Sequence, residues 1–283
     1  MKMKNSELEL LVFNFCFKSK VKMFIDIGSN RPKNGETFLK QHSAANFQSN
    51  ELTYLGFEAN PVCFSYYFEE RPENFIFSNV ALGDRNGFTV LNIPFIENTA
   101  SRNSFHDYLR IVDRKIFKNY HANLDAWFTA NNLGGSEKRH LTSYKKFKVP
   151  IVRLDSLVPC FEEKTILWID VEGSTPEVLR GAGNLLISEN LLAVFIESEY
   201  PVNTERDWTE LESHKILLNA GLKMKFYSEL HNALYVRDLL DKTLNTISSE
   251  ITESPRKERR HRYKLRLKSL FFSGDKLLKK WEN

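Results

Sequence analysis

Two carboxylates stand two residues apart directly after an apolar stretch, as Asp170 and Glu172 in WIDVEGSTPEVLRGA. The run 166–171 is apolar enough for a buried strand, and Pro176 suits the first turn of a following helix. In open α/β sheets, ligands bind beyond the carboxyl ends of the strands, so this pair is predicted to be catalytic. The alternative is that one of the two acids only caps the helix.

A second polar group follows a strand-like run near the N-terminus, in FIDIGSN. Gly28 lets the backbone approach a ligand closely, and Asp26, Ser29 and Asn30 can hold an amino or carboxyl group. The G-x-G-x-x-G pattern that seats a pyrophosphate in dinucleotide-binding folds is absent. These four residues are predicted to bind a cofactor. A turn-forming role for Asp26 is the alternative.

Glu58 ends the next strand-like run, in GFEANP. An acid in that position accepts hydrogen bonds from the hydroxyl groups of a ribose. A nucleoside that needs no phosphate site and that carries an amino-acid-like group fits both strand ends, so S-adenosylmethionine is the predicted cofactor. A solvated strand-end acid is the alternative for Glu58.

Strand and helix patterns alternate along the chain, which predicts an α/β fold with a Rossmann-like, mostly parallel sheet. A hairpin over 223–236 is expected to supply one antiparallel edge strand. The expected helices include 176–187 and 208–220, the second ending at Gly221. The expected strands outside the hairpin are 22–28, 52–58, 75–82, 89–95, 149–154, 166–171 and 191–197.

The composition is that of a folded protein, with 42% hydrophobic and 27% charged residues among 283. No apolar run approaches the roughly 20 residues of a membrane-spanning helix. The N-terminus is predicted to be a docking helix rather than a signal peptide, because Glu7 and Glu9 interrupt the charge pattern of the latter. The three cysteines lack C-x-x-C spacing, which favours a reducing, cytoplasmic location over a disulfide framework or a zinc site.

Three segments are expected: an N-terminal helical extension over 1–20, a main domain over 21–240 and a basic helical extension over 241–283. An insert over 96–148 interrupts the main domain, and it is either a wall of the substrate site or a surface loop. His106 in this insert is a candidate substrate-binding residue.

Residues 256–283 carry eleven Lys or Arg against three acids, interleaved with large apolar residues. This pattern predicts an amphipathic helix. The helix either packs on the domain with its basic face solvated or lies on an anionic membrane surface. Nucleic-acid contact is the least favoured reading, because the rest of the chain is mildly acidic and contains no recognised nucleic-acid-binding module.

The chain resembles the FkbM-type methyltransferases, a branch of the class I S-adenosylmethionine-dependent enzymes. FIDIGSN, GFEANP, NVALGD, VPIVRLDSL, WIDVEGSTPEVLRGA and FIESE occur in the family's order across 23–236. The resemblance implies a seven-stranded sheet with helices on both faces, and methyl transfer to hydroxyl groups of sugars or sugar-bearing molecules. It also implies a role for each matching residue: Asp26, Gly28, Ser29 and Asn30 at the methionine end of the cofactor, Glu58 on the ribose, Asn79, Val80 and Ala81 beside the adenine, Asp170 and Glu172 facing the methyl group, and Glu197 closing the acceptor side.

The cofactor loop departs from the family pattern, because residues 31–34 intervene before Gly35. Methyl transfer to a hydroxyl needs little beyond positioning and a group that takes or shares the proton, which Asp170 or Glu172 can provide. Those two acids and Glu197 could instead gather a divalent metal, but no metal is expected.

The function predicted from the sequence is O-methylation of a sugar, glycan or glycosylated small molecule. One alternative is a non-catalytic membrane-surface or RNA-binding protein on the same fold. Another is an N-methyltransferase of a small molecule. An enzyme that methylates nucleic-acid bases is disfavoured, because IDVEG stands where such enzymes have an N-P-P-Y-type tetrad.

Overall fold

The computed structural model describes residues 1–29, 52–64, 75–96, 141–171, 173–198, 208–228, 232–237 and 240–253. Three predicted site residues, Asn30, His106 and Glu172, lie outside these ranges, as do most of the insert and the basic segment 256–283. The boundaries expected near residues 20 and 240 stay predictions.

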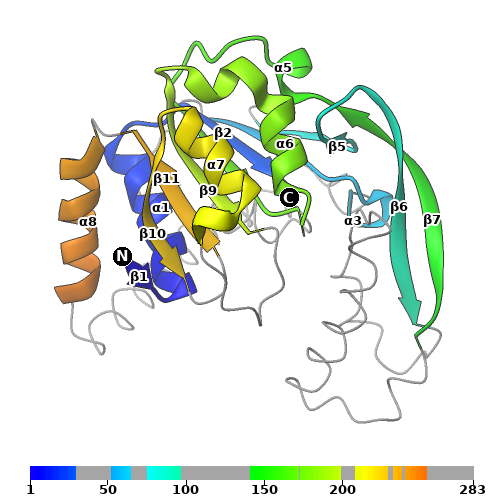
Figure 1. Ribbon diagram of the computed structural model, residues 1–283, viewed down its shortest axis with the longest axis horizontal. Helices are drawn as coiled ribbons and strands as arrows, with labels where there is room; N and C mark the ends of the chain where they lie inside the picture. The colour runs from blue at the N-terminus through cyan, green and yellow to red at the C-terminus, as the bar shows by residue number, and fades with distance from the viewer. Residues whose placement is uncertain are drawn as a thin grey trace, which may run out of the picture.

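An eight-stranded sheet forms the centre of the molecule (Figure 1). Its strands, from one edge to the other, are β1 (Lys2–Met3), β10 (Lys223–Ser228), β11 (Asn232–Val236), β9 (Leu191–Glu197), β8 (Thr165–Ile169), β2 (Met23–Ile27), β3 (Thr53–Phe57) and β4 (Phe75–Ser78). Every strand but β11 runs in the same direction. The predicted α/β fold with a mostly parallel, Rossmann-like sheet is confirmed.

Two details of the prediction are wrong. The sheet has eight strands rather than seven, because the N-terminal β1 adds to β10, where the Tyr227 N–H donates to the Met1 carbonyl at 3.1 Å. The antiparallel strand β11 lies between β9 and β10 and is not at an edge. Its side chains from Ala233 to Val236 are all buried, so β11 fills an interior position, and the hairpin carries the more exposed β10 outward.

A second sheet of three strands holds β5 (Ala81–Leu82), β7 (Leu141–Val152) and β6 (Gly87–Ile96), in that order. The strand expected over 75–82 is therefore two strands, β4 and β5, in different sheets. The strand expected over 149–154 is the end of the longer β7. In Figure 1, β6 and β7 form a long antiparallel ribbon beside the main sheet.

Helices cover both faces of the main sheet. One face carries α1 (Asn5–Lys18), against which α8 (Asp241–Glu253) packs. On the other face, each of the two predicted helices is two elements. The helix expected over 176–187 is α6 (Thr175–Ala182) followed by the 3₁₀ helix η3 (Gly183–Ile187). The helix expected over 208–220 is the 3₁₀ helix η4 (Trp208–Glu210) followed by α7 (Glu212–Asn219). Gly221, with φ +80°, follows α7 as expected of a C-terminal cap. The short helices α3 (Pro61–Phe64) and α5 (Leu154–Leu157) complete the elements described.

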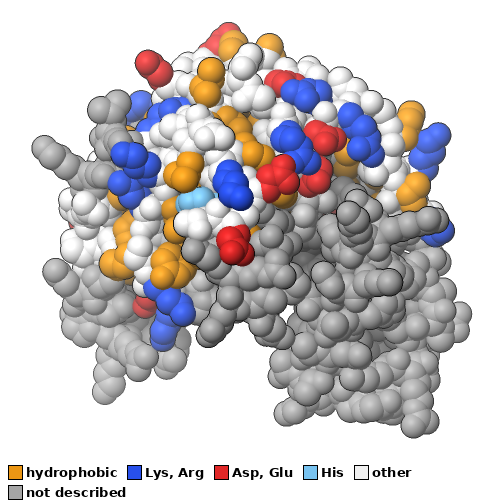
Figure 2. Space-filling model, viewed as in Figure 1, with side chains coloured by type: hydrophobic (Ala, Val, Ile, Leu, Met, Phe, Trp, Pro, Cys, Tyr) orange, Lys and Arg blue, Asp and Glu red, His pale blue; other side chains and the backbone are white. Residues whose placement is uncertain are grey.

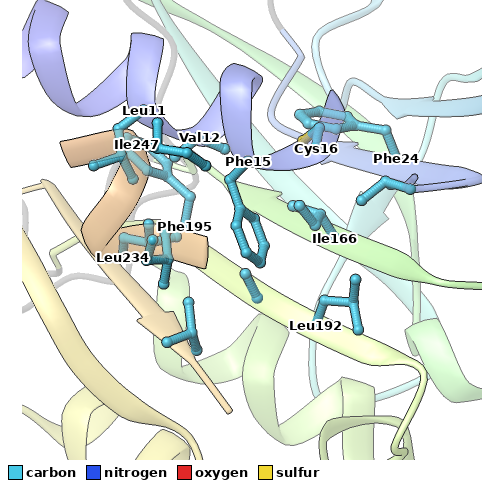
Figure 3. Packing of buried hydrophobic residues seen from close by; sticks show 14 of the residues in the cluster. Leu11, Val12, Phe15, Cys16, Phe24, Ile166, Leu192, Phe195, Leu234 and Ile247 are labelled. Carbon is cyan, nitrogen blue, oxygen red and sulfur yellow. The ribbon is translucent and has the colours of Figure 1, made fainter. Parts of the chain in front are cut away.

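Strand alternation divides the core into two layers. Phe24, Ile166 and Phe195 point toward α1, whose Phe15 packs among them with no exposed surface (Figure 3). The intervening residues, such as Ile25 and Leu167, point toward α6 and α7. Any side chain at the end of a strand therefore belongs to one face or the other by its position in the alternation.

A network of ion pairs ties the second sheet to α6. Arg153, after β7, donates to the backbone carbonyls of Asp84 at 3.0 Å and Arg180 at 3.4 Å. Arg180 lies 3.6 Å from the Asp84 carboxylate and also pairs with Glu177 and Glu212. Figure 2 shows acidic and basic side chains side by side near α6. The network fixes the position of β5 and β7 relative to the helix that follows Asp170.

No helix among the residues described is long and apolar enough to cross a membrane.

Candidate functional site

Four acidic residues lie at the carboxyl end of four neighbouring strands. Asp26 is the fourth residue of β2 and Glu197 the last of β9, while Glu58 and Asp170 directly follow β3 and β8. The strand order β9-β8-β2-β3 makes them a continuous row. We call Asp26, Glu58, Asp170 and Glu197 the acidic edge.

The acidic edge belongs to the face of the sheet that α1 covers. Asp26 is two residues from Phe24, and Glu197 is two residues from Phe195, and both aromatic rings lie in the core layer under α1. Trp168, opposite Asp26 in the ladder, packs against the same layer and lies two residues before Asp170. Because side chains two residues apart in a strand lie on the same face, these acids lie together on the α1 face of the sheet, at the carboxyl ends of its strands.

Asp26 is buried, with 4% of its surface exposed, and its Oδ2 accepts a hydrogen bond from the Tyr54 hydroxyl. Burial raises the pKa of the Asp26 carboxyl to about 7; the bond from Tyr54 opposes this rise, and the negative charges of Asp170 and Glu58 add to it. Three members of the acidic edge therefore interact electrostatically. A carboxyl group poised near neutral pH is typical of a functional site.

Glu58 is also buried, and hydrogen bonds hold both its side chain and its backbone in place. Its Oε1 accepts the backbone N–H of Asn60 at 2.7 Å, its own N–H donates to the Ser78 carbonyl at 3.0 Å, and its carbonyl accepts from the Asn79 side-chain amide at 2.7 Å. These bonds fix a carboxylate beside Asp26. A carboxylate can accept several hydrogen bonds at once, as binding of a ribose diol requires.

Gly28 forms a tight contact between the first loop and the strand that ends at Asp170. Its φ is +83°, and an added Cβ would lie 1.8 Å from the Asp170 carbonyl oxygen. The Gly28 N–H donates to the Phe57 carbonyl at 2.9 Å, and the Asp170 N–H donates to the Ile27 carbonyl at 2.9 Å. The ends of β2, β3 and β8 are thus joined, and Ser29, buried completely, continues the loop by donating its N–H to Phe57 at 3.1 Å.

The N-cap position of α6 is occupied by Ser174 and not by Asp170. Glu172 lies outside the described residues, so the capping alternative for it stays a prediction. Asp170 is partly buried at the strand end. The helix is tied to the next strand instead, because the Thr175 hydroxyl donates to the Glu197 carbonyl at 2.8 Å.

The three residues predicted beside an adenine lie in different environments. Asn79 contacts the edge through its bond to Glu58. Val80 packs against the core layer under α6, and Ala81, 2% exposed, belongs to the small core of the second sheet. Their cofactor role stays a prediction, and only the Asn79 side chain is joined to the acidic edge by a described hydrogen bond.

Sequence reasoning did not single out Tyr54 or Asn60, which hold two of the acids in place. Tyr54 carried a usable signal: it stands four residues before Glu58 in the strand expected over 52–58, so alternation predicts that both side chains lie on the same face. The Asn60 bond comes from a backbone N–H two residues after Glu58, which composition does not reveal.

Among the described residues, no group of three or more His, Cys, Asp or Glu side chains is close enough to hold a metal ion. The alternative set of Asp170, Glu172 and Glu197 includes a residue outside the described ranges. That alternative stays untested.

Comparison with known protein families finds a match over most of the chain. The model of the methyltransferase FkbM domain matches residues 26–231. No curated protein and no solved structure matches the chain. The matched region contains the acidic edge, the loop of Gly28 and Ser29, and α6. It spans well over half of the 283 residues. The chain therefore belongs to the FkbM methyltransferase family.

Proposed function

We propose that this methyltransferase uses S-adenosylmethionine to methylate a hydroxyl group of a sugar, glycan or glycosylated small molecule. The observation that carries the proposal is the acidic edge, in which Asp26, Glu58 and Asp170 interact at the carboxyl end of a Rossmann-like sheet. Four carboxyl groups on one face favour ligands that carry positive charge and hydroxyl groups.

The residues fit the cofactor by their charge and their hydrogen-bonding capacity. S-adenosylmethionine carries a sulfonium and an amino group, and a positive charge near Asp26 would relieve the repulsion from Asp170 and Glu58. Glu58, oriented by Asn60, is suited to accept hydrogen bonds from the ribose hydroxyls. When bound, the cofactor supplies an electrophilic methyl group.

The acceptor side is assigned to the other half of the acidic edge. Asp170 directly follows β8 and Glu197 is the last residue of the adjacent β9, with Trp168 opposite Phe195 in the ladder. A carboxylate there can orient a sugar hydroxyl and take or share its proton as the oxygen attacks. Holding the two reactants in line contributes much of the rate acceleration in such a displacement.

A reducing compartment, such as the cytoplasm, suits the protein, because the described cysteines Cys16 and Cys160 carry free thiols. We further propose that the basic segment 256–283 can bring the enzyme to an anionic membrane surface, where glycans are assembled.

Removal of the Glu58 carboxylate is expected to weaken cofactor binding. Calorimetric titration with S-adenosylhomocysteine should give a dissociation constant about tenfold to a hundredfold higher for Glu58→Gln than for the wild type, because hydrogen bonds to a charged group contribute about 1.5–3 kcal/mol. The control is Glu250→Gln on α8, whose side chain is 58% exposed. If the wild type binds no S-adenosylhomocysteine, the proposal is wrong.

Asp170→Asn should separate binding from chemistry. We expect cofactor affinity close to that of the wild type and a turnover rate lower by about 10² to 10⁴, the usual contribution of a general base. Transfer of a labelled methyl group onto a glycan array, with and without a chelator, measures the turnover and tests metal dependence together. Unchanged turnover in Asp170→Asn would remove Asp170 from the catalytic role.

A further inference from the structure

Tyr54 is a wholly buried tyrosine whose hydroxyl is aimed at the cofactor end of the sheet. It lies in β3 and donates to Asp26 Oδ2 in β2. Its ring is stacked between Phe75, at 4.9 Å and 11°, and Phe24, at 5.9 Å and 5°. Stacked neighbours on both sides fix the ring, so the hydroxyl has little freedom to leave Asp26.

The surroundings of Asp26 otherwise oppose its negative charge. The carboxyl is removed from water, Asp170 faces it from the end of β8, and Glu58 faces it from the end of β3. Trp168 is the ladder partner of Asp26 in β8, and Phe13 of α1 stacks on its ring at 5.7 Å. Of the groups that shift the pKa of Asp26, Tyr54 is the one that favours the ionised form.

We propose that Tyr54 is a positioning residue of the cofactor site: its hydroxyl orients Asp26 as the carboxylate that receives the cofactor's amino group, and couples cofactor binding to loss of the Asp26 proton. This inference rests on the proposed function, because it takes S-adenosylmethionine as the ligand. Tyr54 itself touches Asp26 and need not touch the cofactor.

The sign of the pH dependence follows from the charge of the ligand. A protonated amino group prefers ionised Asp26, so binding below pH about 7 must release the Asp26 proton. Affinity should therefore rise with pH and level off above about 7 to 8. Loss of the Tyr54 hydroxyl removes the bond that favours ionisation, so the pKa of Asp26 rises further and the affinity curve moves to higher pH.

The test is calorimetric titration with S-adenosylhomocysteine between pH about 6 and 8.5, for wild type, Tyr54→Phe and Asp26→Asn. For Tyr54→Phe we expect affinity about tenfold below wild type at pH 6 and within about twofold at pH 8.5, as an upward move of about one pH unit requires. For Asp26→Asn, which lacks the titrating carboxyl group, the affinity should not change with pH. Any change that remains in this variant measures protonation of the ligand itself. Tyr235→Phe is the matched control, a second wholly buried tyrosine whose hydroxyl pairs with His214 at 2.8 Å, and it should follow the wild type.

Wild type alone gives a second measurement, should Tyr54→Phe fail to fold. Titration in two buffers of different ionisation heat counts the protons released on binding, and we expect close to one at pH 6 and close to none at pH 8.5. A flat wild-type profile, or an equal loss of affinity at every pH in Tyr54→Phe, overturns the inference while leaving the proposed function standing. Absence of binding at any pH overturns the proposed function instead.

Discussion

Gly28→Ala is expected to destabilise the protein strongly and to abolish binding of S-adenosylhomocysteine. The new Cβ would lie 1.8 Å from the carbonyl oxygen of Asp170 and 2.7 Å from its carbon, both backbone atoms that no side-chain rotation can move. The left-handed φ of +83° adds about 1–2 kcal/mol for any residue with a Cβ. Overpacking of this kind adds about 1–3 kcal/mol, so a loss of about 2–5 kcal/mol in unfolding free energy is expected from urea denaturation.

Gly221→Ala isolates the backbone part of that loss. Gly221 has nearly the same φ, +80°, but the nearest atom to its added Cβ is the Arg237 guanidinium at 3.5 Å, an ordinary contact. We expect a loss of about 1–2 kcal/mol and unchanged ligand affinity, because Gly221 follows α7 on the other side of the sheet. Equal losses in the two variants would mean that the end of β8 moves away from the first loop at no cost.

The positions of the acids were predictable from sequence because they depend on short patterns. An apolar run that ends in an acid, repeated in neighbouring parallel strands, brings Asp26, Glu58 and Asp170 to one edge whatever the rest of the chain does. Tyr54 was not found, because its burial in an apolar strand hides its hydroxyl among core residues. Its role depends on the register of β2 with β3, which pairs Phe24 with Tyr54 and is a property of two distant segments.

The fold class was predictable for the same reason. The errors in the predicted strands have local causes. The run 75–82 reads as one strand by composition, but the Asn79 side chain bonds to the Glu58 carbonyl where β4 ends, and β5 continues in another sheet. Lys2 and Met3 are too few to form a recognisable pattern, and β1 forms only because β10 offers its edge. Strand order at the hairpin is set by burial: β11 has four buried positions of five, and β10 has two of six.

Phe15→Ala is expected to cost about 3–5 kcal/mol of unfolding free energy, the range for removal of a buried aromatic side chain. Phe15 lies in α1, outside the matched region 26–231, yet no part of it is exposed, and its ring packs toward the sheet in the core cluster that also holds Phe195 and Ile247 (Figure 3). Urea denaturation of the full chain measures the loss. A cost this large would make α1 part of the folded domain, although the sequence suggested an extension.

Phe17→Ala supplies the matched control, because it removes the same side chain from the same helix at a position that is 44% exposed. Surface substitutions change stability little, so about 1 kcal/mol or less is expected. The contrast separates packing from helix propensity, which both substitutions change equally. If both variants lose the same small amount, α1 is a detachable extension and the face that carries the acidic edge is stable without it. If Phe15→Ala alone is strongly destabilised, the α1 layer is required to hold the strands whose ends form the site, and a chain starting at residue 21 should fail to fold.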